Sequence, residues 1–186
     1  LDGKKVNFPE KLTFSLFLDE QSFIPKLILN KEIIKSLKIA YSKGSMLSTP
    51  LGESNLANIR LKEFVNNLNK HIKNKKKLIE IGCGNGELLN VFKKLGYDTL
   101  GFEIGPQFSN GIKKYNLKIL QEEFHPKYLN EKVDCIFSSG CLEHIIEPID
   151  LIDKAYDSLN NKGIFFGSVP NSEIHFKTGS IEELCY

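Results

Sequence analysis

Three glycines stand close together between an apolar stretch and a helical pattern, in an arrangement that suits the binding of a nucleotide-like molecule. The apolar stretch is Leu78–Ile81, and the helical pattern runs from Glu87 to Leu95. The loop between them consists of Gly82, Cys83, Gly84, Asn85 and Gly86. Glycines allow unusual backbone angles and the close approach of a ligand, and the N–H groups at a helix start attract a carboxylate. We therefore predict that this loop binds a cofactor.

The spacing of the glycines distinguishes between two kinds of cofactor. A dinucleotide-binding sequence G-x-G-x-x-G that starts at Gly82 would need a third glycine at the position of Glu87. This mismatch disfavours a nicotinamide-dependent oxidoreductase. The spacing G-x-G-x-G instead resembles motif I of the class I methyltransferases. The resemblance implies that the cofactor is S-adenosylmethionine and that its product is S-adenosylhomocysteine.

Acidic residues near the loop extend the resemblance. It implies that Glu80, two residues before Gly82, helps to orient the methionine end of the donor. It also implies that Glu103, at the end of the next strand, accepts both ribose hydroxyls and that Ile104 lies against the adenine. A carboxylate suits a vicinal diol because it accepts two hydrogen bonds at once. We expect this strand end to tolerate alanine at Glu103, with donor affinity reduced at least about tenfold.

Two further pairs of residues are assigned to the donor by the same resemblance. After the third strand, the family commonly places an acidic residue near the adenine amino group, followed by a residue whose backbone amide reaches the ring. Glu123 and Phe124 match these places best, and Glu122 is the alternative if the alignment shifts by one. Ser138 and Ser139 end the fourth strand and should border the methionine half. The structural alternatives are a surface carboxylate and ordinary turn chemistry.

The catalytic candidates follow the fourth strand. The sequence L-E-H-I at 142–145 resembles the post-strand motif of many small-molecule methyltransferases. Methyl transfer is an in-line displacement, so a base is needed only if the acceptor must lose a proton. His144 is the best candidate because histidine titrates near neutrality, and a structural hydrogen-bonding role is its alternative. Glu143 would orient His144 or an acceptor hydroxyl, unless it only stabilises a helix start.

No metal site is predicted. Some relatives hold a divalent metal through an E-x-x-E-H sequence, but here Gly140 replaces the first glutamate and one oxygen ligand is missing. His175, later in the chain, does not supply that oxygen. The four cysteines form neither a CxxC pair nor a zinc-binding spacing with histidine, which fits a reducing compartment.

Strand and helix patterns alternate along the residues that carry these motifs. Strands are expected over 78–81, 99–103, 118–120, 133–138 and 164–169, with helices over 54–72, 87–95 and 148–159, a helix ending at 115 and a turn at 160–163. Nearly continuous apolar strands joined by helices are typical of a parallel sheet covered on both faces. We therefore predict an α/β fold with a Rossmann-like doubly wound, mostly parallel sheet. Its ligand should lie at the carboxyl ends of the strands.

The ends of the chain differ from this pattern. Residues 12–18 alternate as a strand does, and residues 31–41 have helical spacing. We predict an N-terminal extension or cap over 1–50, with Tyr41 and Met46 able to close over the site, and a methyltransferase domain over 51–186. The antiparallel sixth and seventh strands of the family cannot be placed after the fifth strand. We therefore expect another segment of polypeptide, or a neighbouring copy, to complete the sheet.

The composition argues against several classes of partner. Lysine and arginine total 25 against 23 aspartates and glutamates, so no broad basic field would attract a nucleic acid. No apolar stretch approaches the roughly 18 residues of a membrane span, and no signal peptide is evident. We predict a cytoplasmic enzyme that methylates a small-molecule acceptor, such as a sugar or polysaccharide precursor. A non-catalytic S-adenosylmethionine-binding domain is the main alternative, and the sequence leaves the oligomeric state open.

Overall fold

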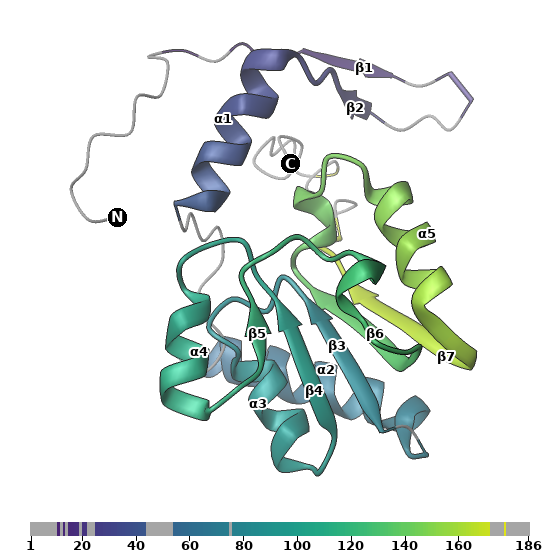
Figure 1. Cartoon of the computed structure of the whole chain (residues 1–186). Helices are drawn as coiled ribbons and strands as arrows, with labels where there is room; N and C mark the ends of the chain where they lie inside the picture. Colours follow the sequence, from purple (N-terminus) through teal and green to yellow (C-terminus); the bar gives the residue numbers. More distant parts are fainter. Residues whose placement is uncertain are drawn as a thin grey trace.

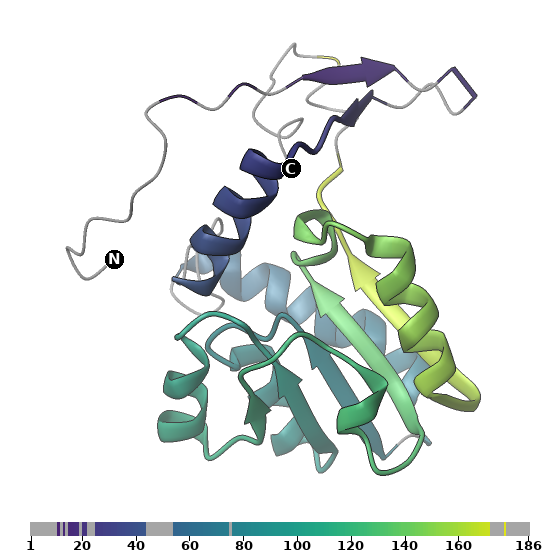
Figure 2. The same ribbon diagram turned by 45° about the horizontal axis from the view of Figure 1, so that its top comes forward.

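The computed structural model describes residues 11, 13, 15–18, 20, 21, 25–43, 54–74, 76–171 and 177. Its N-terminal part contains an antiparallel pair of strands, β1 (Leu16–Leu18) and β2 (Pro25–Leu27), followed by helix α1 (Lys31–Ser42). The Asn30 side chain caps α1 by accepting a hydrogen bond of 2.9 Å from the Ile33 backbone N–H. Figures 1 and 2 show this part lying beyond the carboxyl ends of the main strands.

Within the described residues, the main sheet has five parallel strands in the order β5-β4-β3-β6-β7. These strands are β3 (Lys77–Ile81), β4 (Asp98–Phe102), β5 (Ile119–Leu120), β6 (Val133–Ser139) and β7 (Leu159–Ser168). The helices that follow α1 are α2 (Asn55–Ile72), α3 (Glu87–Lys94), α4 (Phe108–Tyr115) and α5 (Pro148–Ser158). Short 3-10 helices lie at η1 (Pro126–Tyr128) and η2 (Leu142–His144). The predicted doubly wound sheet is confirmed (Figure 1).

Two apolar clusters cover the two faces of the sheet. Because side chains alternate along a strand, Leu78 and Ile79 belong to opposite clusters. The first cluster joins the sheet to α2 and α3, with Leu68 and Phe92 at its centre. The second cluster joins the sheet to α5, with Ala155 fully buried. The prediction of helices on both faces is therefore confirmed.

The turn predicted at 160–163 lies inside a strand. Leu159 already pairs with Val133, and the pairing then resumes at Cys135 with Ile164, so the intervening residues form an irregularity in β7. Lys162 takes a left-handed backbone angle, φ 65°, within it. The prediction of a separate turn is therefore wrong, because the strand already starts at Leu159, which pairs with β6. The predicted boundary near 50 and the sixth and seventh strands concern residues outside the described part.

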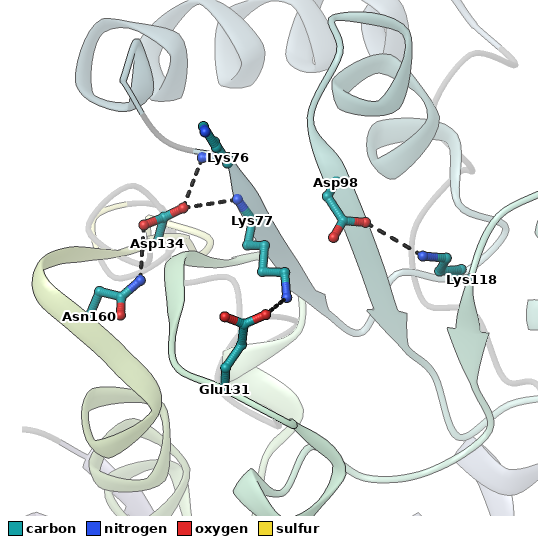
Figure 3. Close-up of polar contacts among 7 residues, drawn as sticks. All are labelled: Lys76, Lys77, Asp98, Lys118, Glu131, Asp134 and Asn160. Atoms are coloured by element: carbon teal, nitrogen blue, oxygen red, sulfur yellow. Dashed lines mark hydrogen bonds and ion pairs between the residues drawn. The ribbon is translucent and has the colours of Figure 1, made fainter.

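Polar contacts join the amino ends of the strands (Figure 3). One carboxylate oxygen of Asp134 accepts hydrogen bonds from the backbone N–H groups of Lys76 and Lys77, at 2.9 and 3.0 Å, and the other accepts from the Asn160 amide at 3.0 Å. The Lys77 ammonium also pairs with Glu131. Asp134 thereby links the start of β6 to the start of β3 and to β7. This network lies at the opposite ends of the strands from the glycine loop.

Candidate active site

The topology of the sheet points to one edge as the binding site. The chain winds from β3 through β4 to β5 on one side, and then crosses to β6 on the other side of β3. Ligands of doubly wound sheets bind at the carboxyl ends of the strands where the winding direction changes. The loops after β3, β4 and β6 meet there. Most of the predicted residues lie in these loops or at the strand ends before them, whereas Glu123 and Phe124 follow β5.

The glycine loop after β3 has a backbone that only glycine adopts easily. Gly82, Gly84 and Gly86 have φ angles of 71°, 52° and 78°. A side chain at Gly82 would also collide with Cys141, and one at Gly86 would collide with Leu117, whereas the space beside Gly84 is open. The backbone of the loop can therefore approach a ligand closely at Gly84.

The Cys83 thiol is buried, so only the backbone of this residue is available for the predicted contact with a ligand. The residue is 6% exposed, and its Sγ fills the space that Gly101 leaves on β4, where an added Cβ would come within 2.6 Å. Burial raises the pKa of the Cys83 thiol well above its usual range, and the nearby Glu80 and Glu103 carboxylates raise it further. The thiol is thus a neutral packing group, and the backbone N–H of Cys83 donates to the carbonyl of Phe102 at 3.1 Å.

Glu103 follows β4. Its carboxylate accepts hydrogen bonds from the loop after β3 and from the loop after β4. Its side chain is buried, with one oxygen accepting a 2.8 Å hydrogen bond from the Gly84 backbone N–H. The other oxygen accepts from the Gly105 backbone N–H at 2.7 Å and from the Gln107 amide at 3.1 Å. Sequence reasoning did not single out Gln107. The sequence feature that could have indicated Gln107 is the Gly105-Pro106 pair before it, because a turn there brings Gln107 back to the Glu103 carboxylate.

Glu80 is a buried acid beneath the glycine loop. It is 3% exposed, accepts a hydrogen bond from the Leu89 backbone, and has one oxygen, Oε2, with no hydrogen-bond partner among the described residues. Burial raises the pKa of Glu80 well above its ordinary value, and the negative charges of Glu87 and Glu103 raise it further. A cation placed near Glu80 would offset both effects.

The residues assigned to the adenine end lie at the neighbouring strand ends. Glu122 and Glu123 are both exposed, and Ile104 is half-buried. Phe124 is 5% exposed, and its ring packs edge-on against Phe102 at 5.2 Å between centroids. The side chain of Phe124 therefore belongs to the core, and only its backbone is available for the predicted contact. The choice between Glu122 and Glu123 stays open.

The two serines that end β6 differ in exposure. Ser138 is fully buried, whereas the half-buried Ser139 has its hydroxyl 3.2 Å from that of Ser168. Cys141 follows them and packs against Gly82. Burial, with the Glu103 charge, raises the pKa of Cys141 to about 12, so this thiol stays protonated at neutral pH. Ser139 is the serine more accessible to a ligand.

The predicted catalytic pair lies on η2, next to helix α1. The His144 Nε2 and Glu143 Oε1 atoms are 4.0 Å apart, and the two side chains are 18% and 15% exposed. The Tyr41 ring of α1 lies 5.6 Å from the His144 ring, between centroids. The structure thus brings Tyr41 of the predicted cap beside the predicted base. Met46 lies outside the described residues.

Two other sequence predictions concern metal and membrane. Among the described residues, no group of three or more histidine, cysteine, aspartate or glutamate side chains is arranged to hold a metal ion. His175 is not among those residues. No helix in the described part of the chain combines the length and the apolar character that a membrane crossing requires.

Comparison with known proteins adds a family match and two curated relatives. Residues 56–183 match a family model described as "Methyltransferase domain". The ubiquinone biosynthesis O-methyltransferase of Aliivibrio fischeri is 26% identical over 108 residues, which are 53% of this chain and 46% of that protein. The DNA mismatch repair protein MutS of Orientia tsutsugamushi is 30% identical over 150 residues, which are 74% of this chain and 17% of that protein. The chain thus spans less than half of either relative.

Solved structures with the same fold include three methyltransferases. A SAM-dependent methyltransferase from Archaeoglobus fulgidus has a TM-score of 0.54 at 19% identity, covering 65% of this chain and 58% of that chain. SAM-bound CalS10, an amino pentose methyltransferase from Micromonospora echinaspora, has a TM-score of 0.53 at 13% identity, covering 61% and 50%. The sugar N-methyltransferase KedS8 from Streptoalloteichus sp ATCC 53650 has a TM-score of 0.52 at 17% identity, covering 70% and 59%.

Proposed function

This chain belongs to the methyltransferase-domain family, and from that premise we propose that it transfers a methyl group from S-adenosylmethionine to a small-molecule acceptor. The membership confirms the predicted resemblance to class I methyltransferases. The observation that carries the proposal is the hydrogen bond of 2.8 Å between the Gly84 backbone and the Glu103 side chain. This bond joins the glycine loop of β3 to the acidic end of β4, so both parts of the expected donor site form one unit.

The chemistry of the site fits this donor. S-adenosylmethionine supplies an activated methyl group on a cationic sulfonium, and its methionine part also carries an ammonium and a carboxylate. Glu80 and Glu103 place two carboxylates beside the loop, and Glu80 has a buried oxygen with no hydrogen-bond partner among the described residues. Helix α3 starts in the loop without a side-chain cap, so its N–H groups suit the donor carboxylate. Gly84 and Glu103 would hold the ribose side.

The reaction asks little of the protein beyond alignment and the exclusion of water. Helix α1 lies beyond the carboxyl ends of the strands (Figure 2). Its Tyr41 ring lies next to the His144 ring. His144 would accept a proton if the acceptor must lose one, and Glu143 would orient the imidazole or an acceptor hydroxyl. Cys141 is not a competing nucleophile, because its raised pKa keeps the thiol protonated at neutral pH.

A sugar or polysaccharide precursor is the acceptor class that we favour. Two of the similar solved structures are described as methyltransferases of an amino pentose and of a sugar. A non-catalytic S-adenosylmethionine-binding domain remains the second candidate, because the residues that would bind the donor do not prove turnover. The cytoplasmic location and the lack of a nucleic-acid partner also remain predictions.

Donor binding tests the first half of the proposal. Calorimetric titration of the purified chain should show binding of S-adenosylmethionine and of S-adenosylhomocysteine, and none of NADH. Tight binding of NADH without a response to the other two ligands would overturn the proposed cofactor.

Turnover tests the second half. A panel of amino sugars and hydroxyl sugars is incubated with donor carrying a radiolabelled methyl group. His144→Asn should lower the transfer rate by about 100-fold or more while leaving donor affinity unchanged. His71→Asn is the matched control, because His71 is exposed on the far end of α2. Donor binding with no transfer to any acceptor of the panel would favour the non-catalytic alternative.

A further inference from the structure

The hydrogen bonds of Glu103 limit what this carboxylate can offer to a ribose. A carboxylate accepts about four hydrogen bonds, two on each oxygen. Oε1 of Glu103 already accepts two, from the backbone N–H of Gly105 and from the amide of Gln107, and Oε2 accepts one, from Gly84. One acceptor position is left, on Oε2. A vicinal diol needs two positions.

Gln107 carries a second acceptor next to that carboxylate. The amide nitrogen of Gln107 must face Glu103, because a carboxylate accepts and does not donate, and so the amide oxygen Oε1 points elsewhere. That oxygen is buried and has no hydrogen-bond partner among the described residues. A buried acceptor without a partner costs free energy, so a hydroxyl that reached it would be favoured.

The local structure places the Gln107 amide at Glu103 and not on its own helix. Gln107 is the N-terminal capping residue of α4, yet its side chain makes no capping hydrogen bond. The amide instead lies over Gly105, where any Cβ would collide with it. The terminal torsion of glutamine is broad, so small rotations about that bond can aim the amide oxygen at a hydroxyl while the amide nitrogen stays at Glu103.

We propose that two side chains bind the ribose diol of the donor: Glu103 Oε2 accepts a hydrogen bond from one hydroxyl, and Gln107 Oε1 accepts one from the other. This inference rests on the proposed donor and deepens it. It differs from the expectation that Glu103 accepts both hydroxyls by itself. Gln107 is then a donor-binding residue, and Gly105 provides the space for its amide.

A ligand series tests the proposal. Calorimetric affinities are measured for S-adenosylhomocysteine and for its 2′-deoxy and 3′-deoxy analogues, with the wild type, Gln107→Met and the control Ser109→Ala on the same helix. Methionine keeps the length of the side chain and removes both polar groups. Gln107→Met should bind the complete ligand roughly threefold to tenfold more weakly. It should bind one of the two deoxy analogues as tightly as the wild type does, because that analogue lacks the hydroxyl that donates to Gln107.

Two results would overturn the proposal. If Gln107→Met weakens all three ligands by one factor, the role of Gln107 is structural. If the variant binds the complete ligand as tightly as the wild type or more tightly, Glu103 takes both hydroxyls. Should Gln107→Met fail to fold, Gln107→Asn, which withdraws the amide by one methylene, is put through the same series. A wild-type chain that binds none of the three ligands would refute the proposed donor itself, so the two failures are distinguishable.

Discussion

Replacing Glu103 with alanine should weaken the fold and donor binding together, because one carboxylate supports both. Its side chain is buried and accepts hydrogen bonds from the backbone N–H groups of Gly84 and Gly105 and from the Gln107 amide. The sequence-based expectation that this strand end tolerates alanine treated Glu103 as a partner of the ligand alone. The structure makes it a partner of two loops as well.

The size of the effect follows from the donors that alanine would leave without an acceptor. A buried donor left unsatisfied costs about 1–3 kcal/mol. The bond from Gly105 is buried and that from Gly84 is partly buried, so water can replace the second more easily. Together they predict a loss of about 2–4 kcal/mol in the free energy of unfolding, which is a large part of the roughly 5–15 kcal/mol typical of a domain. Loss of a hydroxyl bond to a charged group should lower donor affinity by about tenfold to 100-fold.

Urea unfolding and calorimetric titration with S-adenosylhomocysteine measure the two effects separately. Glu123→Ala is the matched control for stability, because it removes an exposed carboxylate from a neighbouring strand end. Glu103→Gln should fall between the wild type and alanine in stability, since it keeps one acceptor oxygen. A Glu103→Ala protein with wild-type stability would refute the argument from the two loops, and one with wild-type affinity would show that the ribose is held elsewhere.

Three further changes have definite expected outcomes. Burial holds the pKa of Glu80 above its value in the unfolded chain, so its contribution to stability is full below that unfolded pKa and is lost as pH rises through the folded pKa. Denaturant unfolding should therefore favour Glu80→Gln over the wild type increasingly as pH rises above about 4. A difference between the two that is independent of pH would count against the raised pKa. Gly86→Ala should lower the free energy of unfolding by about 2–4 kcal/mol, because of the left-handed backbone and the collision with Leu117. Gly84→Ala, which lies beside open space, should lower it by only about 1–2 kcal/mol. Equal urea midpoints of the two variants would contradict this difference. Asp134→Asn should lower the melting temperature and leave donor affinity unchanged, because its three bonds lie at the amino ends of the strands; a change in affinity would be the contrary result (Figure 3).

The elements of the fold were predictable because their signals are local. Ser54 accepts a hydrogen bond from the Ala57 backbone and starts α2, as expected of a helix from 54 to 72. The strand predicted over 78–81 is one residue longer in the structure. The glycine loop was predictable for the same reason, since its three glycines have the left-handed angles that their residue type permits. Periodicity and residue type decide these features within a few positions of the chain.

The partners of the site residues were not predictable in this way. Cys83 read as part of the loop, yet its thiol fills the space beside Gly101 on another strand. The early start of β7 depends on the pairing of Leu159 with Val133, which no local pattern contains. The sequence also does not show how many hydrogen bonds Glu103 accepts within the protein. That number decides how many hydrogen bonds Glu103 can still accept from a ligand. These features arise from packing between segments that are distant in the sequence.

The same distinction explains why the donor is easier to read from this sequence than the acceptor. The donor residues follow the ends of β3, β4 and β6, so each stands at a fixed place relative to a strand, and the strand order brings those places together. The acceptor side that we propose depends instead on the contact between Tyr41 of α1 and His144 of η2. Nothing near either residue in the sequence requires that contact. Its geometry depends on how α1 packs over the sheet, and a change in that packing would alter the acceptor without altering the donor. If the proposed site is correct, helix α1 is the element where variation should change specificity, while Glu103 and the glycine loop should keep their hydrogen bonds for the fold as well as for the donor.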